Sequence, residues 1–335
     1  MKVLLLGMNY ASTLNSLVLG FKAHAIPVEG LSFEENRSSY NQFDEITCIF
    51  PNKPLSYFAY KWKTLTGLIR LYRSVKKADV IHVYSNLVLP TRLEGKLLKF
   101  LFLKAAKNKK KFITYVGSEV RIPEIEFENN PYYKEAYSTP GYEYPYESRV
   151  LSHASQKKFA DLGFELICTP DTAEYIHPDY FRVDKITFHA GVAAQHPDSN
   201  PAPGEVLVIH APTAPIAKGS RTIRAVMEKI AKDEPNITFR ELQNLSNAEY
   251  QELTGTCALY IDQVIWGFHG VAAIQAMALK KPVVCFIKPA LESYLAPVLL
   301  MFVVGNLLNS FHYDFSESVA FILLISALGY SSKNA

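Results

Sequence analysis

The stretch that decides the fold begins with Val206-Leu-Val-Ile-His-Ala-Pro212 and ends with Pro282-Val-Val-Cys-Phe-Ile287. Both are short apolar runs typical of buried strands, and Leu259-Tyr-Ile-Asp-Gln263 between them is a third. Segments with helical spacing, Ser220–Ala231 and Val271–Leu279, separate these runs. Strands that alternate with helices predict an α/β fold with a parallel sheet, whose ligands bind at the carboxyl ends of the strands.

Two loops in this half fall between the end of a strand and the start of a helix: Lys218-Gly219 and Gly267-Phe-His-Gly270. The free N–H groups and the dipole of a helix amino terminus favour negative charge, so either loop suits a phosphate. The structural alternatives are a surface lysine before a helix and a tight glycine turn.

The amino-terminal half shows the same alternation, which predicts a second α/β unit. The expected strands are Lys2–Gly7, Val80–Val83, Phe112–Tyr115, Leu166–Thr169 and Lys185–Phe188, and the expected helices are Leu14–His24, Leu65–Ala78 and Leu93–Lys107. Gln195–Gly204 is dense in Pro, Asn, Ser and Gly, as linkers are. We therefore expect a first domain over 1–188, a linker over 189–204, a second domain over 205–297 and a tail over 298–335.

Composition narrows the class of protein. The chain has 335 residues and a net charge of +3, which is too small to indicate a nucleic-acid partner. Its four cysteines have no paired spacing and no metal-ligand spacing, so we expect reduced, buried thiols in a cytoplasmic protein: Cys48, Cys168, Cys257 and Cys285. The amino terminus suits a first strand better than a signal peptide.

The second half resembles the GT-B glycosyltransferases that use nucleotide sugars, in particular the large retaining family (glycosyl transferases group 1) that includes sucrose and glycogen-type synthases. The matching residues are Lys218-Gly219, Gly270, Ala276-Met-Ala278 and Lys281-Pro-Val-Val284. The resemblance implies two Rossmann-like domains facing across a cleft. It also implies transfer of a sugar from a nucleoside-diphosphate sugar, with retention and without an obligatory metal or other cofactor.

The resemblance also implies roles for individual residues. Lys218 and Gly219 would meet the donor diphosphate together with the backbone of the second loop, for which we name Gly267, His269, Gly270 and Val271. Gln275 stands where the family has a glutamate that binds the ribose hydroxyls, and Gly267 stands where it has a carboxylate near the donor sugar. Asp262 is the nearest remaining acid, so it is either a compensating ligand for the sugar or an ordinary residue at a strand end.

In the first half, Tyr115-Val-Gly-Ser-Glu-Val-Arg121 resembles a strand-end segment that borders the cleft in this family. Gly117, Ser118, Glu119 and Arg121 would then contact an acceptor or donor sugar, and Asn9 in the first strand–helix loop would lie nearby. The alternative is a local ion pair between Glu119 and Arg121.

Two further segments each leave two interpretations open. Tyr132–Tyr146 holds six tyrosines, which suit either a platform for sugar rings or a loop packed on the sheet. Lys104–Lys111 ends an expected helix before a strand, and it suits either a solvated face or a peripheral contact with anionic lipid headgroups.

The last 38 residues differ in composition from the rest, because only Asp314, Glu317 and Lys333 are charged between 298 and 335. A reading-frame change near Pro297 and a diverged, membrane-associated tail both explain this. The tail and the lost glutamates favour an alternative function: an impaired glycosyltransferase-like protein that binds a nucleotide or a partner without turnover.

Overall fold

The structure is a computed structural model that describes residues 1–34, 44–50, 56–85, 102–184, 204–279, 281–289, 291 and 322–324. The chain divides into two compact units. Unit 1 comprises Met1–Pro123 and Tyr146–Ala190, and unit 2 comprises Glu124–Pro145 and Gly191–Ala335. The sequence placed residues 124–145 in the first domain, whereas in the structure they group with the second unit.

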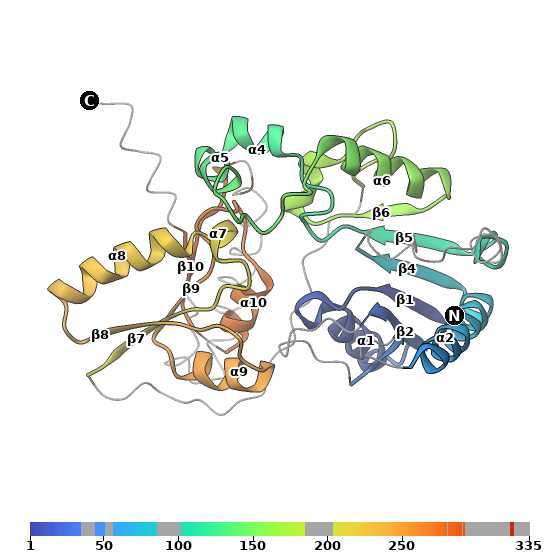
Figure 1. Ribbon diagram of the computed structural model, residues 1–335, viewed down its shortest axis with the longest axis horizontal. Helices are drawn as coiled ribbons and strands as arrows, with labels where there is room; N and C mark the ends of the chain where they lie inside the picture. The colour runs from blue at the N-terminus through green and yellow to red at the C-terminus, as the bar shows by residue number, and fades with distance from the viewer. Residues whose placement is uncertain are drawn as a thin grey trace, which may run out of the picture. The chain divides into compact units, whose positions relative to one another are not determined.

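Unit 1 is built on a six-stranded parallel sheet (Figure 1). Its strands lie in the order β3-β2-β1-β4-β5-β6, which is that of the Rossmann fold. Their bounds are β1 Val3–Gly7, β2 Val28–Glu34, β3 Ile46–Phe50, β4 Val80–Tyr84, β5 Lys110–Thr114 and β6 Glu165–Ile167.

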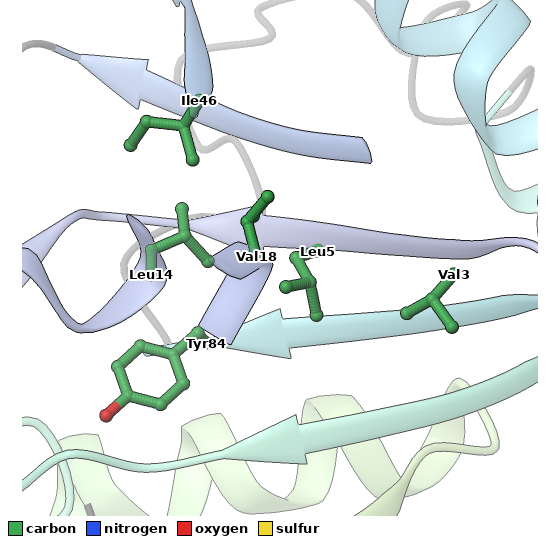
Figure 2. Close-up of a cluster of buried hydrophobic side chains, with 6 residues drawn as sticks. All are labelled: Val3, Leu5, Leu14, Val18, Ile46 and Tyr84. Atoms are coloured by element: carbon green, nitrogen blue, oxygen red, sulfur yellow. The ribbon is translucent and has the colours of Figure 1, made fainter. Parts of the chain in front are cut away.

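The core of unit 1 follows from its central strand. All five residues of β1 are buried, as in a strand covered on both faces of a parallel sheet. Figure 2 shows Leu14 and Val18 of α1 beside Leu5 of β1 and Ile46 of β3. Helix α1 therefore covers one face of this sheet.

The remaining elements of unit 1 connect or flank these strands. They include η1 Tyr10–Ser12, α1 Thr13–Ala23, α2 Tyr57–Lys77, α6 Arg149–Asp161 and η3 Pro170–Tyr175. Helix α2 starts at Tyr57, before the predicted start at Leu65. The Ser56 side chain accepts a hydrogen bond from the Ala59 N–H and so caps the helix at this earlier position.

Unit 2 contains a parallel sheet in the order β11-β10-β9-β7-β8. Its strands are β7 Val206–His210, β8 Ile237–Glu241, β9 Leu259–Ile261, β10 Val283–Cys285 and β11 Ile322–Leu324. Strand β8 pairs with one side of β7 and β9 with the other, which is the flavodoxin-like arrangement. The order of the strands therefore reverses between the neighbouring strands β7 and β9, which form the topological switch point.

The helices of unit 2 come from two parts of the chain. They are α4 Pro123–Asn129 and α5 Pro131–Tyr137 from the first half, and α7 Pro215–Lys218, α8 Ser220–Asp233, α9 Asn247–Thr256 and α10 Val271–Ala278 from the second. Tyr133 and Tyr142 of the first half pack with Ala214 and Ala217 of the second. This shared core explains why residues 124–145 belong to unit 2.

The predicted α/β class with two Rossmann-like parallel units is confirmed. The expected strand Lys185–Phe188, most of the expected helix Leu93–Lys107, most of the linker, and the tail apart from β11 lie outside the described residues. In the part of the chain that is described, no helix has the length and apolar character needed to cross a membrane.

Candidate functional site

Polar side chains gather at the switch point of unit 2. His210 ends β7 and Asp262 directly follows β9, and both are fully buried. The carboxyl ends of strands at a switch point are where open α/β sheets bind their ligands. The strand order alone therefore predicts that a ligand binds at this edge of the sheet.

Lys218 and Asp262 form a buried ion pair at this edge. The Lys218 Nζ lies 3.0 Å from Asp262 Oδ1. The second carboxylate oxygen, Oδ2, accepts the Gly270 N–H at 2.6 Å. Three residues that the sequence singled out separately are thus joined by one carboxylate.

Two helices begin beside this carboxylate. Helix α8 starts after Gly219 and α10 after Gly270, and neither has an acidic residue in its first turn. Neither glycine has a side chain with which to cap the first N–H groups. The positive ends of both helix dipoles therefore lie near Lys218.

Gly219 is required by the backbone between α7 and α8. Its φ is +80°, in the left-handed region that glycine tolerates best. A Cβ at this position would also lie 2.6 Å from Val264 Cγ2, just after β9. The Val264 N–H donates to the Lys218 carbonyl at 3.0 Å, so the backbone of Lys218 is fixed on the β9 loop.

His210, at the end of β7, hydrogen-bonds both to β9 and to the first residue of α8. Its Nδ1 lies 2.9 Å from the Ile261 carbonyl oxygen and its Nε2 lies 2.8 Å from Ser220 Oγ. A carbonyl only accepts, so Nδ1 carries the proton and Nε2 accepts from the serine hydroxyl. Burial lowers the pKa of His210, which keeps the ring neutral and suits a structural role.

Gly267 is tightly covered by Lys288. A Cβ on Gly267 would overlap the Lys288 side chain, and the Lys288 N–H donates to the Gly267 carbonyl at 2.9 Å. The Lys288 Nζ pairs with Glu126 Oε1 at 2.7 Å, and both side chains are buried. The space that a side chain at position 267 needs is therefore filled by the aliphatic part of Lys288.

The other residues predicted for the donor lie on or before α10. Gln275 is buried one turn after Val271, which begins the helix. His269 is partly buried, and its ring lies 4.1 Å from that of Phe268. The structure places all of them on the chain segment that follows β9.

The candidates in unit 1 lie at its carboxyl edge, after β1 and β5. Asn9 is fully buried, and its Oδ1 accepts the Asn15 N–H at 3.1 Å. The Glu119 carboxylate accepts the Val116 N–H at 2.8 Å, which closes the loop that contains Gly117. The Ser118 hydroxyl is 3.0 Å from that of Tyr146.

Arg121 pairs with Glu147, and both side chains are buried. The Arg121 charge also acts on Glu119, so the local interaction between these two residues that the sequence left open stays a prediction. Burial raises the pKa of Glu119, while the Val116 N–H and the nearby Arg121 charge act in the opposite direction.

Most of the tyrosine-rich segment is packed rather than displayed. Tyr133 and Tyr142 are buried, and their rings lie 6.2 Å apart in a T-shaped arrangement. Tyr144 packs on Trp266 at 5.1 Å. Tyr132 and Tyr146 remain exposed. For most of the segment, the packed-loop interpretation fits the contacts better than a platform for sugars.

Sequence reasoning missed several residues around this site, among them Glu126, Lys288 and Glu143. The Glu143 carboxylate accepts the N–H groups of Ile216 and Ala217 at 2.8 and 3.1 Å, at the start of α7. Glu126 and Glu143 are far from the site in sequence, so no local pattern marks them. Among the described residues, no group of three His, Cys, Asp or Glu side chains could hold a metal ion.

No model of a known protein family matches the chain, and no curated protein sequence matches it. Solved structures with a similar fold include sucrose-phosphate synthase from Thermosynechococcus elongatus, at 12% identity and a TM-score of 0.45, covering 85% of this chain and 81% of that one. The catalytic domain of starch synthase IV from Arabidopsis thaliana, bound to ADP and acarbose, is 13% identical at a TM-score of 0.46, covering 88% and 84%. WaaG, a glycosyltransferase involved in lipopolysaccharide biosynthesis, is 12% identical at a TM-score of 0.43, covering 89% and 84%. The case for a function rests on the residues at the β7–β9 edge.

Proposed function

We propose that the chain transfers a sugar from a nucleoside-diphosphate sugar to an acceptor, and that the donor diphosphate binds at the carboxyl ends of β7 and β9. The observation that carries this proposal is the Lys218–Asp262 pair beside two helix amino termini, each preceded by a glycine that has no capping side chain. A cation and two sets of N–H groups favour a ligand with several negative charges.

The same groups suit the chemistry. When the bond between the anomeric carbon and the diphosphate oxygen breaks, negative charge develops on the leaving diphosphate. The Lys218 ammonium has three N–H donors and gives one to Asp262, so it can also meet a phosphate oxygen. Preorganised donors of this kind stabilise the transition state because they need little rearrangement.

We assign Asp262 to the donor sugar, as an acceptor for a hydroxyl group, and Gln275 to the ribose. A glutamine oxygen still accepts a hydrogen bond but without the added strength of a charge. Retention at the anomeric carbon is part of the proposal and follows from the resemblance at Lys218-Gly219 and Gly270–Val284. The acceptor side, with Ser118 and its neighbours after β5, is assigned on the same basis.

Calorimetric titration with a panel of nucleoside diphosphates tests the donor site, and mass analysis of products from a panel of sugar donors tests transfer. Lys218→Met removes the charge and keeps most of the length of the side chain; because it also breaks a buried ion pair, circular dichroism must show that the variant is folded under the conditions of the titration. We expect it to weaken binding roughly ten- to a hundredfold, the equivalent of about 1.5–3 kcal/mol. Lys229→Ala, an exposed lysine on α8, is the matched control and should bind like the wild type. If no nucleoside diphosphate binds, the proposal fails.

A second function is favoured by one observation: the Lys288 side chain, which pairs with Glu126, fills the space beside Gly267. A site that lacks this carboxylate and has Gln275 in place of a glutamate suits a protein that binds a nucleotide without turnover. Binding of a diphosphate with no product from any donor would support this alternative. Sustained release of nucleoside diphosphate would rule it out.

A further inference from the structure

Helix α2 of unit 1 has two faces of different character. Its inner face is buried and is formed by Gly67, Leu71, Ser74 and Val75. Its outer face carries large apolar side chains at alternating spacings of four and three residues: Phe58, Trp62, Leu65, Ile69 and Tyr72. At 3.6 residues per turn, this spacing forms one continuous stripe opposite the buried face.

The stripe is strongly exposed. Phe58 and Trp62 are 83% and 67% exposed, and the other three side chains are between 37% and 50% exposed. Including Tyr60, six of the 14 exposed large hydrophobic residues in the described part of the chain lie on this helix. Single apolar side chains on a surface need no explanation, but a contiguous stripe indicates a binding surface.

The charge of α2 has a single sign. The helix has no acidic residue and six basic ones: Lys61, Lys63, Arg70, Arg73, Lys76 and Lys77. Arg70 lies 3.5 Å from Glu29 of β2, whereas Lys63, Arg73, Lys76 and Lys77 are exposed. With about 100° between successive residues, Lys63, Arg70, Arg73 and Lys77 fall along one flank of the stripe, and Lys76 falls at its end.

A second basic segment adjoins the end of α2. The Lys109 Nζ donates to the Lys76 carbonyl at 3.2 Å, which brings residues 104–111 against this helix. Lys104, Lys107 and Lys110 are exposed there. The lysine cluster found in the sequence therefore extends the basic surface of α2.

We propose that α2 binds flat on an anionic lipid surface, with the Trp62 stripe in the interface and the basic flank at the headgroups. An amphipathic helix with aromatic and aliphatic residues on one face and Lys/Arg beside them is the type that binds such interfaces. A second copy of the chain fits less well, because a two-fold contact through α2 would set like charges against each other. A nucleic acid fits less well too, because the aliphatic Leu65 and Ile69 separate the rings of Trp62 and Tyr72 and interrupt any continuous stack of bases.

Trp62 is a natural reporter for this proposal, because the chain has only two tryptophans. Vesicles of phosphatidylcholine mixed with phosphatidylglycerol should shift the emission of the intact protein to shorter wavelength. Trp62→Phe, which leaves Trp266 of unit 2 as the only reporter, should show no shift. Pure phosphatidylcholine vesicles should give a much smaller change.

Co-sedimentation with the same vesicles measures affinity. Leu65→Glu with Ile69→Glu should weaken binding at least tenfold, whereas Val226→Glu, an exposed apolar position on α8, should not. Neutralising Lys63, Arg73 and Lys76 together as glutamines should weaken binding about a hundredfold, at about fivefold for each charge. Raising the salt concentration should weaken the wild type in the same direction.

Several results would overturn the proposal: no spectral shift and no co-sedimentation, equal binding to neutral vesicles, or unchanged binding by the Leu65/Ile69 variant. A dimer of the wild type that the same variant abolishes, without lipid binding, would assign the stripe to a second copy instead. The substituted side chains are exposed, and circular dichroism checks that each variant remains folded.

Discussion

Lys218 and Asp262 are 44 positions apart in sequence, and they meet in a buried ion pair of 3.0 Å. This contact connects the end of α7 to the end of β9. The Gly270 N–H on the other carboxylate oxygen adds the start of α10. The three chain segments that form the switch-point edge are thus held by one side chain.

Removing one partner of the buried pair should cost far more stability than removing one partner of a surface pair. Removing one partner leaves a buried charge uncompensated, so Lys218→Met or Asp262→Leu should each lower the free energy of unfolding by about 3–5 kcal/mol. The double variant should cost much less than the sum of the two. Urea unfolding of all four proteins gives the coupling energy.

The control for this cycle is the exposed Lys157–Asp161 pair on α6, with a distance of 2.8 Å. Its coupling energy should be about 0.3–0.5 kcal/mol, as for other pairs four residues apart on a helix. Equal coupling energies in the two pairs would contradict the burial of Lys218 and Asp262.

Gly267→Ala should destabilise the protein by about 1–3 kcal/mol, because its Cβ overlaps Lys288 and the core around it must shift. Gly20→Ala is the matched substitution, since nothing lies within 4 Å of a Cβ at that position of α1. It should stabilise by up to about 1 kcal/mol through helix propensity. Thermal unfolding of both variants is the measurement, and a neutral Gly267→Ala would show that Lys288 yields easily.

Ser220→Ala should cost about 1–3 kcal/mol, because it leaves His210 Nε2 buried without its donor. Ser138→Ala is the comparison: that hydroxyl also makes a hydrogen bond, to the Lys134 carbonyl, but at an exposed position. Its effect should stay within about 0.5 kcal/mol. Chemical unfolding compares the two variants, and similar losses would refute the role assigned to His210.

His82 should make the stability of the protein depend on pH. Burial lowers the pKa of His82 from 6.5 to about 4, so between these values the unfolded state is protonated and the folded state is not. The contribution of His82 to the free energy of unfolding is fully present above pH 6.5. It falls by about 1.4 kcal/mol per pH unit as the pH drops toward 4. His82→Gln should remove that part of the slope. Unfolding curves at several pH values test this, and equal slopes in both proteins would contradict it.

The strands that the sequence predicted are largely those at the centre of each sheet. Strands β1, β7 and β9 are short apolar runs because both of their faces are covered. Strands β2, β3 and β8 were not identified. In the edge strand β8, the run Ile237-Thr-Phe-Arg-Glu241 alternates with polar residues, and an alternating, half-exposed strand gives no continuous apolar run. Strand β2 lies inside its sheet, but Glu29, Ser32 and Glu34 interrupt its apolar residues.

The site shows a similar limit. Lys218, Asp262 and Gly270 each follow a recognisable strand or precede a helix, so the sequence indicates them. The Lys288–Glu126 contact spans 162 positions, and no sequence pattern near either residue predicts it. Only the three-dimensional path of the chain brings Lys288 against both Gly267 and Glu126.

That path also sets an order of events during synthesis. Glu143 emerges from the ribosome 73 positions before Ile216, whose N–H it accepts. At about 5–20 residues per second, that separation lasts about 4–15 seconds. Throughout this interval Tyr133 and Tyr142 have no second sheet to pack against, although the strands of unit 1 on both sides of them are complete or nearly so. A nascent chain at this stage carries an uncovered aromatic segment inside an otherwise finished domain, which is the kind of surface that chaperones bind.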